Sequence, residues 1–211
     1  MPDRSDLDLL AAWRSGDRRA GGELFDRYFV SLHRFFRNKV GDDFEELVQR
    51  TLARCVEGQE RFEGRSAFRS YLFGIAYNVL REHLRARSAN PVRGLGDDAS
   101  VVDLGQPGPS TALGARREQR LLLEGLRRLP LSDQVVLELF YWEQMSSPEI
   151  GAVLEIPGPT VRSRLRLARE RLLGHLDELA HKPDELKSTT DDLERWAAEL
   201  REQFRRDAQS G

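Results

Sequence analysis

Residues 160–172, TVRSRLRLARERL, form the segment of this 211-residue chain that is best equipped to bind a charged partner. They hold five arginines and one glutamate, a net charge of +4, whereas the whole chain has a formal net charge of −2. Guanidinium groups bridge two acceptors of guanine in the major groove and also attract phosphates. Apolar residues recur at spacings of four, three and four from Val161 to Leu172, which predicts a helix with one buried face. The arginines would then face duplex DNA; a solvated surface helix is the alternative interpretation.

A second segment, residues 61–87, combines aromatic, amide and guanidinium side chains. On a helical wheel, one narrow sector is apolar and holds Phe68, Leu72, Ile75 and Val79. The opposite side holds Tyr77, Asn78, Arg81 and Arg85. Aromatic rings stack on unpaired bases at ~1–3 kcal/mol per base, and an asparagine reads a base edge. This outer face suits bases that have left the duplex, although an ordinary amphipathic helix would show the same pattern.

Helical periodicity predicts the elements that must position these two segments. In the first block, residues 6–89, the helical patterns stop near Gly41 and Gly58, and Ser66 is the predicted N-cap of a helix that reaches Arg87. The block ends where the helical pattern ends, and a change of composition follows.

The second block, residues 118–176, is predicted to contain a helix-turn-helix. A helix with Ser132 as its N-cap comes first. Ser147 is the predicted N-cap of a short helix over residues 148–154, which has proline at its first position. The turn EIPGP follows, and Thr160 is the predicted N-cap of the arginine-rich helix. A short helix before a basic one is the geometry that places a helix in a major groove.

Two segments outside these blocks differ in composition. Residues 90–117 are rich in Gly, Pro, Ser and Asp and lack a helical period, which predicts a flexible linker. Residues 177–211 hold ten acids against six lysines and arginines, and 190–206 has the spacing of an amphipathic helix. This acidic extension could cover the basic helix and hold the free chain inactive, dock a partner, or lengthen the domain. The predicted fold is all-α: two small helical domains joined by a flexible linker, the second a helix-turn-helix domain, plus a C-terminal helical extension.

Composition argues against several classes of protein. No stretch approaches the ~18 apolar residues that cross a membrane, and the acidic N-terminus does not resemble a secretory signal. The single cysteine, Cys55, cannot form an intrachain disulfide and shows no metal-ligand spacing with the four histidines. No paired carboxylates, nucleophile with a base or Gly-rich phosphate loop is evident. We therefore expect a cytoplasmic protein with no membrane insertion, no metal, no cofactor and no enzyme activity.

Three stretches of the sequence resemble one protein family in order and spacing. They are FEELVQRTLARC at residues 44–55, RFEGRSAFRSYLFGIAYNVLREHLR at 61–85 and LPLSDQVVLELFYWEQMSSPEIGAVLEIPGPTVRSRLRLARERL at 129–172. The chain thus resembles the sigma-70 family of RNA polymerase sigma factors, in the compact extracytoplasmic-function branch. The resemblance implies that the chain binds core RNA polymerase and reads promoter DNA at a duplex −35 element and a melted −10 element. It also implies control by an anti-sigma factor or another regulator.

The resemblance further implies roles for individual residues. Glu45, Glu46 and Gln49 would contact polymerase, and the helix over residues 134–143 would help dock the second domain on the polymerase flap. The residues implied for the −10 element are Phe68, Tyr71, Tyr77, Asn78, Arg81 and Arg85, with Asn78 at the base-reading position. Those implied for the −35 element are Thr160, Arg162, Ser163, Arg164, Arg166 and Arg169. Tyr71 and Glu155 depart from the family, which usually has tryptophan and glycine there.

Two other functions fit parts of the sequence. A helix-turn-helix regulator that binds DNA without polymerase explains residues 147–172 but not the aromatic face of residues 66–87. Such regulators usually read two half-sites as dimers. An interaction protein that never touches DNA would use the arginines to dock an acidic partner. A test of binding to core RNA polymerase distinguishes the sigma-factor interpretation from both alternatives.

Overall fold

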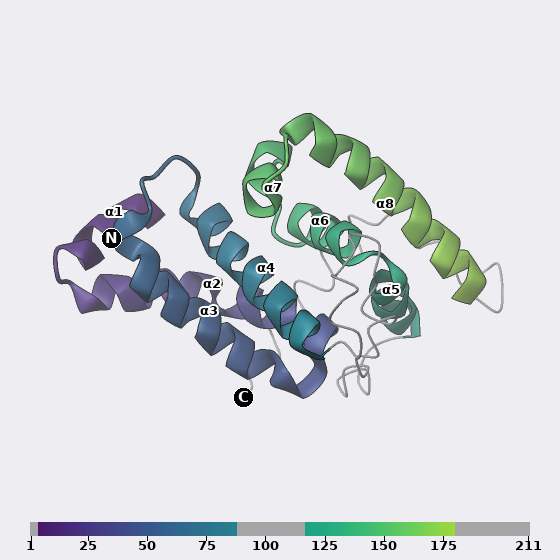
Figure 1. The fold of residues 1–211 in the computed structure, drawn as a ribbon, viewed down its shortest axis with the longest axis horizontal. Helices are drawn as coiled ribbons and strands as arrows, with labels where there is room; N and C mark the ends of the chain where they lie inside the picture. The colour runs from purple at the N-terminus through teal and green to yellow at the C-terminus, as the bar shows by residue number, and fades with distance from the viewer. Residues whose placement is uncertain (1–3, 88–116, 180–211) are drawn as a thin grey trace.

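The computed structural model describes residues 4–87 and 117–179, and every regular element in these two ranges is a helix (Figure 1). The first range forms α1 (Asp6–Arg14), α2 (Arg18–Val40), α3 (Phe44–Gly58) and α4 (Phe68–Arg87), with 3₁₀ turns at Gly41–Asp43 and Gln59–Arg61. The second forms α5 (Arg117–Arg128), α6 (Leu131–Tyr141), α7 (Ser147–Leu154) and α8 (Gly158–Leu179). We call the two ranges the N-terminal unit and the C-terminal unit. The all-α prediction is confirmed; the predicted linker as far as residue 116 and the extension from residue 180 lie outside the described residues.

Aromatic side chains organise the N-terminal unit. Phe36, Phe68 and Phe73 are at most 1% exposed, and Phe35 meets Phe73 edge to face with ring centroids 5.6 Å apart. The helices around them begin at well-formed caps. Ser5 and Asp8 exchange hydrogen bonds in a capping box at α1, and the carboxylate of Asp17 accepts hydrogen bonds from the first turn of α2. The buried rings of Phe68 and Phe73 hold one face of α4 in the core and leave its other face at the surface.

The structure corrects the predicted N-cap of α7 and that of α8. α7 is capped by Ser146 rather than Ser147, because only Ser146 has a carboxylate three residues later. The backbone N–H and the hydroxyl of Ser146 donate to Glu149 Oε2 at 2.9 and 2.7 Å. α8 begins at Gly158, two residues before Thr160. Its proline at position 159 is tolerated because N–H groups in the first turn have no partner within the helix.

The starts of α6 and α4 are corrected in the same way. α6 begins at Leu131, and the Pro130 carbonyl accepts hydrogen bonds from the N–H groups three and four residues later, so Ser132 lies inside the helix and is buried. α4 begins at Phe68, two residues after Ser66. The Ala67 carbonyl accepts the first hydrogen bonds of α4, from residues 70 and 71, at 3.0 and 3.3 Å. In both cases backbone geometry, rather than the nearest serine, sets the start.

The predicted helix-turn-helix is present as α7 and α8. Between the two helices Glu155 adopts a left-handed conformation with φ of 57°. Gly151 allows the turn and the start of α8 to approach α7 closely. A Cβ at this position would lie 2.6 Å from the Ile156 carbonyl oxygen and 3.7 Å from Val161 Cγ2. The missing side chain lets α8 pack closely on α7, and Val161 is completely buried between them.

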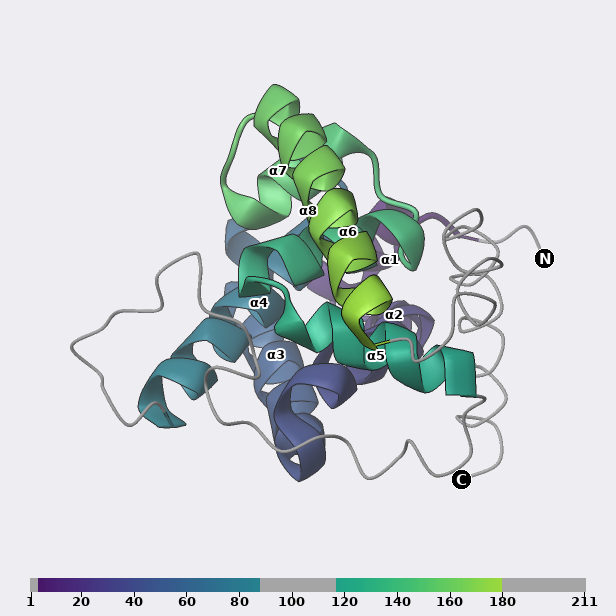
Figure 2. The same ribbon diagram turned by 90° about the vertical axis from the view of Figure 1, so that its right-hand side faces the viewer.

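The two units share one core across their boundary. α7 packs on α4, and both views place α6 at the junction between the units (Figures 1 and 2). Val135, Leu139 and Val153 of the C-terminal unit belong to the same buried cluster as Phe35 and Phe73 of the N-terminal unit. A second, smaller cluster joins α5, α6 and α8. Apolar faces on α6 and α7 therefore pack the C-terminal unit against the N-terminal unit.

Gly58 lies where the end of α3 meets Tyr71 of α4. A Cβ at Gly58 would lie 2.4 Å from the Tyr71 hydroxyl oxygen, and the Tyr71 ring packs on Phe62 with centroids 4.8 Å apart. We predict that Gly58→Ala lowers the free energy of unfolding by ~1–3 kcal/mol, because the ring must shift out of its packing. Urea unfolding followed by circular dichroism measures the change.

Two variants test the steric origin of that loss. Tyr71→Phe in the Gly58→Ala chain should recover most of the stability, since the next ring atom, Cζ, lies at an ordinary 3.7 Å from the new Cβ. Gly22→Ala is the matched control: it is exposed within α2 and a Cβ there meets nothing within 4 Å. It should stabilise by up to ~1 kcal/mol through helix propensity. Failure of Tyr71→Phe to rescue would refute the clash.

Candidate nucleic-acid interface

The two faces of α8 divide as the sequence predicts. Val161, Ala168 and Leu172 are at most 1% exposed and pack toward α7, α5 and α6. The opposite face is open to solvent. It presents Thr160, Arg162, Ser163, Arg166 and Arg169, whereas Arg164 is half-buried. The structure therefore offers a basic helical surface of the kind that fits a major groove.

Two arginines of α8 are held by carboxylates. Arg166 donates to Glu170 at 2.6 Å within the same exposed face, a pair that water and salt screen strongly. Arg171 donates to Asp133 of α6, whose carboxylate is 5% exposed. Arg171 thus ties α8 to α6, while Arg162 and Arg169 present their charge outward. Only tertiary structure separates these roles, because all five arginines look alike in sequence.

The outer face of α4 borders a hollow of ≈ 320 Å³ between α3 and α4. Its lining residues are Arg54, Tyr71, Ile75, Asn78, Arg81, Glu82 and Arg85. Asn78 and Arg85 are exposed, and Arg81 is half-buried. The structure thus brings four of the predicted −10 residues together: Tyr71, Asn78, Arg81 and Arg85. An amide, guanidinium groups and one aromatic edge around a hollow can hold an unstacked base and its phosphate.

Two charged residues that line this hollow, Arg54 and Glu82, were not among the predicted site residues. Arg54 of α3 makes a two-point contact with Glu82 of α4, at 2.9 and 2.6 Å, and Arg50 approaches the same carboxylate at 3.6 Å. The hydrogen bond from Arg54 lowers the pKa of Glu82. Glu82 therefore stays charged and neutralises part of the basic wall. No sequence pattern pairs residues 28 positions apart, so this contact could be identified only from the packing of α3 on α4.

Two of the predicted base-stacking rings are in the core, which corrects their assignment. Phe68 is 1% exposed, with Tyr28, Phe62 and Tyr71 around it at centroid distances of 5.9–6.2 Å. Tyr77 is 8% exposed and lies under the guanidinium of Arg81, 5.5 Å from the ring centroid. Large aromatic rings at a helix boundary with the core bury their area rather than face water. In this structure neither ring is available to stack on a base.

Two family models match the chain: Sigma-70 region 2 over residues 24–90 and Sigma-70, region 4 over residues 119–172. The chain is 31% identical over 180 residues to the ECF RNA polymerase sigma factor SigM of Mycobacterium tuberculosis, covering 83% of this chain and 88% of SigM. It is 31% identical over 184 residues to the RNA polymerase sigma factor CnrH of Cupriavidus metallidurans, covering 83% and 96%. The chain belongs to the sigma-70 family, in the extracytoplasmic-function branch.

Solved structures agree with this membership. CnrH in complex with the cytosolic domain of CnrY matches with a TM-score of 0.63 at 26% identity, covering 84% of this chain and 100% of that chain. The sigma factor RpoE from Bartonella quintana, in complex with the anti-sigma factor NepR, matches in fold with a TM-score of 0.60 at 22% identity, covering 74% and 96%. Both DNA-directed segments lie inside the matched ranges. The chain is a promoter-recognising sigma factor, and nothing in the comparisons supports a polymerase-independent regulator.

The residues predicted to bind polymerase lie together on this sigma factor. Glu45, Glu46 and Gln49 are exposed on one face of α3, opposite Leu47 and Val48, which are buried. Their grouping is the arrangement that a partner surface needs, and their role stays a prediction.

The helix predicted to dock on the polymerase flap is largely covered in this sigma factor. Residues 131–137 and Leu139 of α6 are buried, and Gln134 is completely so, whereas Phe140 is 36% exposed. The role of residues 134–143 in docking on the polymerase flap stays a prediction.

Between residues 4 and 87 and between 117 and 179, no cluster of His, Cys, Asp and Glu could hold a metal ion. No described helix is long and apolar enough to span a bilayer. Cys55 is completely buried, and burial raises the pKa of its thiol to about 12.

The pair between Arg171 and Asp133 gives a prediction about stability. Arg171→Gln should lower the free energy of unfolding by ~1–3 kcal/mol, because it leaves the buried Asp133 carboxylate without its charged partner. Arg169→Gln, an exposed arginine on the same helix, is the control and should change stability by less than ~0.5 kcal/mol. Thermal unfolding of both variants checks this. Equal effects would show that Arg171 is a surface charge like its neighbours.

Proposed function

We propose that this sigma factor binds core RNA polymerase through the exposed face of α3 and directs it to promoters whose −35 element is read by α8 and whose −10 element is read by α4. The observation that carries the proposal is the pairing of two different nucleic-acid faces in one chain. α8 offers an outward arginine surface for duplex DNA, and α4 borders a hollow with an exposed amide for an unpaired base. Reading a promoter and melting it needs both.

On α8, the proposed groove contacts are Thr160, Arg162, Ser163, Arg164, Arg166 and Arg169. Arg162 and Arg169 are exposed, so a guanine edge or a phosphate can replace water around them without breaking a buried contact. Arg166 must exchange its exposed pair with Glu170 for DNA, which costs little because such pairs are weak in water. The remaining positive charge attracts phosphates on both sides of the groove.

On α4, the proposed −10 contacts are Tyr71, Asn78, Arg81 and Arg85. Unstacking one base costs a few kcal/mol, which capture in the hollow offsets. Asn78 reads the base edge, and Arg85 with Arg81 holds the backbone. Phe68 and Tyr77 act in this proposal from beneath: Phe68 supports the Tyr71 ring, and Tyr77 supports the Arg81 guanidinium.

Family membership supports the partners and the location that we propose for this chain. CnrH and RpoE were solved with CnrY and with the anti-sigma factor NepR, and we propose an anti-sigma factor or other regulator for this chain too. Because these partners lie in the bacterial cytoplasm, we propose that the chain acts there, as a regulatory factor rather than a catalyst. We keep the proposed division into residues 6–89 for polymerase and −10 binding, a linker over 90–117, residues 118–176 for −35 binding and an acidic extension over 177–211.

Titration of labelled full-length protein with bacterial core RNA polymerase, at physiological salt, tests the proposal directly. We expect saturable one-to-one binding, followed by specific initiation in run-off transcription of genomic fragments. Alanine in place of Glu45, Glu46 and Gln49 together should weaken binding at least about tenfold by removing a patch of contacts. The absence of core binding by the wild-type protein would reject the proposal.

Asn78→Ala tests base reading on α4. We expect it to lose about 5- to 100-fold in discrimination at a single −10 base, because one pair of hydrogen bonds to a base edge is removed, with unchanged affinity for core polymerase. Transcription from a set of promoters with each −10 base replaced in turn measures this. Equal loss at every position would mean that Asn78 does not read a base.

Arg162→Ala and Arg166→Ala test groove binding by α8. Each should weaken dependence on the −35 element by about 5- to 100-fold while leaving initiation on a pre-opened template intact, because that template needs only the −10 contacts. Arg171→Ala is the matched comparison: it should cost stability rather than −35 selectivity. Unchanged −35 dependence in Arg162→Ala and Arg166→Ala would place the −35 contacts elsewhere.

A further inference from the structure

The outward side of α8 is divided into two parallel stripes, and all six side chains in them are exposed. The basic stripe holds Arg162, Arg166 and Arg169, and the uncharged stripe holds Thr160, Ser163 and Leu167. Residues three and four apart lie one above the other on a helix, so each set forms a continuous line. At ~100° per residue the two stripes lie roughly 120° apart around the helix axis. Charged and uncharged side chains therefore occupy separate parts of one surface.

Positive charge also lies on the far side of the uncharged stripe. Helical spacing places Arg164 and Arg171 there. Arg164 is half-buried, whereas the side chain of Arg171 is 49% exposed although it pairs with Asp133. Glu170 borders the uncharged stripe as well, and Arg166 holds its carboxylate at 2.6 Å. The uncharged stripe is thus flanked by guanidinium groups on both sides.

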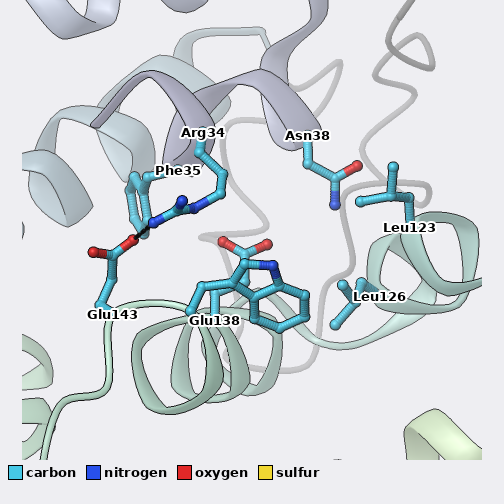
Figure 3. Close-up of a pocket in the computed structure, with 8 residues that line it drawn as sticks. Arg34, Phe35, Asn38, Leu123, Leu126, Glu138 and Glu143 are labelled. Atoms are coloured by element: carbon cyan, nitrogen blue, oxygen red, sulfur yellow. Dashed lines mark hydrogen bonds and ion pairs between the residues drawn. The ribbon is translucent and has the colours of Figure 1, made fainter. Parts of the chain in front are cut away.

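The basic stripe differs from the cations that lie at the boundary between the two units. Figure 3 shows Arg34 of α2 donating to Glu143, and Arg69 of α4 pairs in the same way with Glu149. Within the described residues, the basic stripe has only the exposed pair that Glu170 makes with one of its arginines. Its charge is therefore available to phosphates.

This distribution of charge matches what a helix meets in the major groove. The groove is about 12 Å wide and a helix with its side chains is about as wide. The flanks of the helix then face the phosphates and the outer bases, while its centre faces the base edges between them. Contacts to phosphates position a protein on the duplex, and contacts to base edges supply specificity. Guanidinium groups on both flanks would therefore place the uncharged stripe over the bases.

Leu167 is the apolar member of the uncharged stripe. Its side chain is 40% exposed and belongs to neither buried cluster, whereas Leu165 and Leu172 of the same helix pack against the core. Within α8, residues 158–179, it is the one large apolar side chain that is exposed. A leucine makes no hydrogen bond to a base, but thymine presents an apolar 5-methyl group in the major groove. Among the four bases, thymine is therefore the one that suits this side chain.

We propose that Leu167 is a specificity-determining residue of the −35 reader and contacts the 5-methyl group of one thymine in the major groove. The inference rests on the proposed function, because it requires α8 to lie in the groove of the −35 element. Contact removes both apolar groups from water, and loss of one methyl group costs about three- to fivefold in affinity. Cytosine lacks this methyl group, so the contact favours a T·A pair over a C·G pair.

Replacement of thymidine by deoxyuridine tests the contact, because it removes the 5-methyl group and keeps the hydrogen bonds of the base pair. The promoter with the strongest run-off initiation by the holoenzyme supplies the −35 element. Each thymidine of that element, on either strand, is replaced in turn. Competition between substituted and unsubstituted duplexes for the holoenzyme measures their relative affinity. We expect the wild-type holoenzyme to lose about three- to fivefold at the thymidine that Leu167 contacts.

Variants assign this deoxyuridine penalty to one side chain. Leu167→Ala should remove the penalty at that thymidine, and Leu167→Met, which keeps an apolar side chain of similar size, should retain it. Thr160→Ser removes the other methyl group of the uncharged stripe and should leave the penalty in place. Leu7→Ala is the control for the loss of an exposed leucine. Leu7 is 56% exposed on α1, and its replacement should change neither the affinity nor the penalty.

The outcomes separate this inference from the proposed function. A −35 element without a T·A pair, or a wild-type holoenzyme that binds both duplexes equally, would overturn the thymine contact and leave −35 reading by α8 intact. An equal loss of affinity for both duplexes in Leu167→Ala would also overturn it, by assigning Leu167 to a contact with polymerase. If binding of the holoenzyme does not depend on the −35 element at all, the proposed reader fails and this inference fails with it.

Discussion

The burial of Lys39 against Glu138 is the constraint on which the arrangement of this sigma factor depends. A charged group that is not exposed to water needs a partner of opposite charge. Lys39 has the carboxylate of Glu138 from the C-terminal unit and the carbonyl and ring of Phe35 from the N-terminal unit. Its position fixes how α6 lies against α2, and the apolar faces of α6 and α7 then complete the core of the N-terminal unit. Because ionic contacts depend on geometry more strongly than apolar ones, this boundary has one preferred register.

The helices that face nucleic acid follow a different rule from those at the boundary. On α8 and on the outer side of α4, positive charge is left in water, where a phosphate can replace the solvent. At the boundary, positive charge is covered by carboxylates. The formal net charge of −2 conceals this division. What matters for function is which arginines are already satisfied, as Arg171 is by Asp133, and which, like Arg162, still face solvent.

Much of the fold and part of the site could be predicted from the sequence. Helical periodicity located the helices, and the buried stripe from Val161 to Leu172 separated the two faces of α8 correctly, because both depend on local spacing. The N-caps were misplaced by one to three residues; at α7 two neighbouring serines compete, and only the carboxylate of Glu149 decides between them. Phe68 and Tyr77 were misassigned because a helical wheel shows which side of a helix a residue faces. It does not show how far the neighbouring helices cover that side.

The boundary between the units could not be predicted at all. It joins residues about 100 positions apart, such as Lys39 and Glu138, and neither stands in a pattern that indicates a partner. The same holds for Arg54 and Glu82 at the hollow beside α4. Such pairs can be identified only from the packing of two helices against each other. Amphipathic spacing, in contrast, can be recognised within the sequence of a single helix.

The buried thiol of Cys55 has a practical and biological consequence. With its pKa raised to about 12 and no exposure to solvent, it is a poor target for oxidants as long as α3 stays packed on α4. An oxidant in solution therefore reaches this sulfur only when the helices around it open. The rate at which Cys55 is alkylated would also measure how often the helices around it open. Local unfolding could thus be followed without adding a probe.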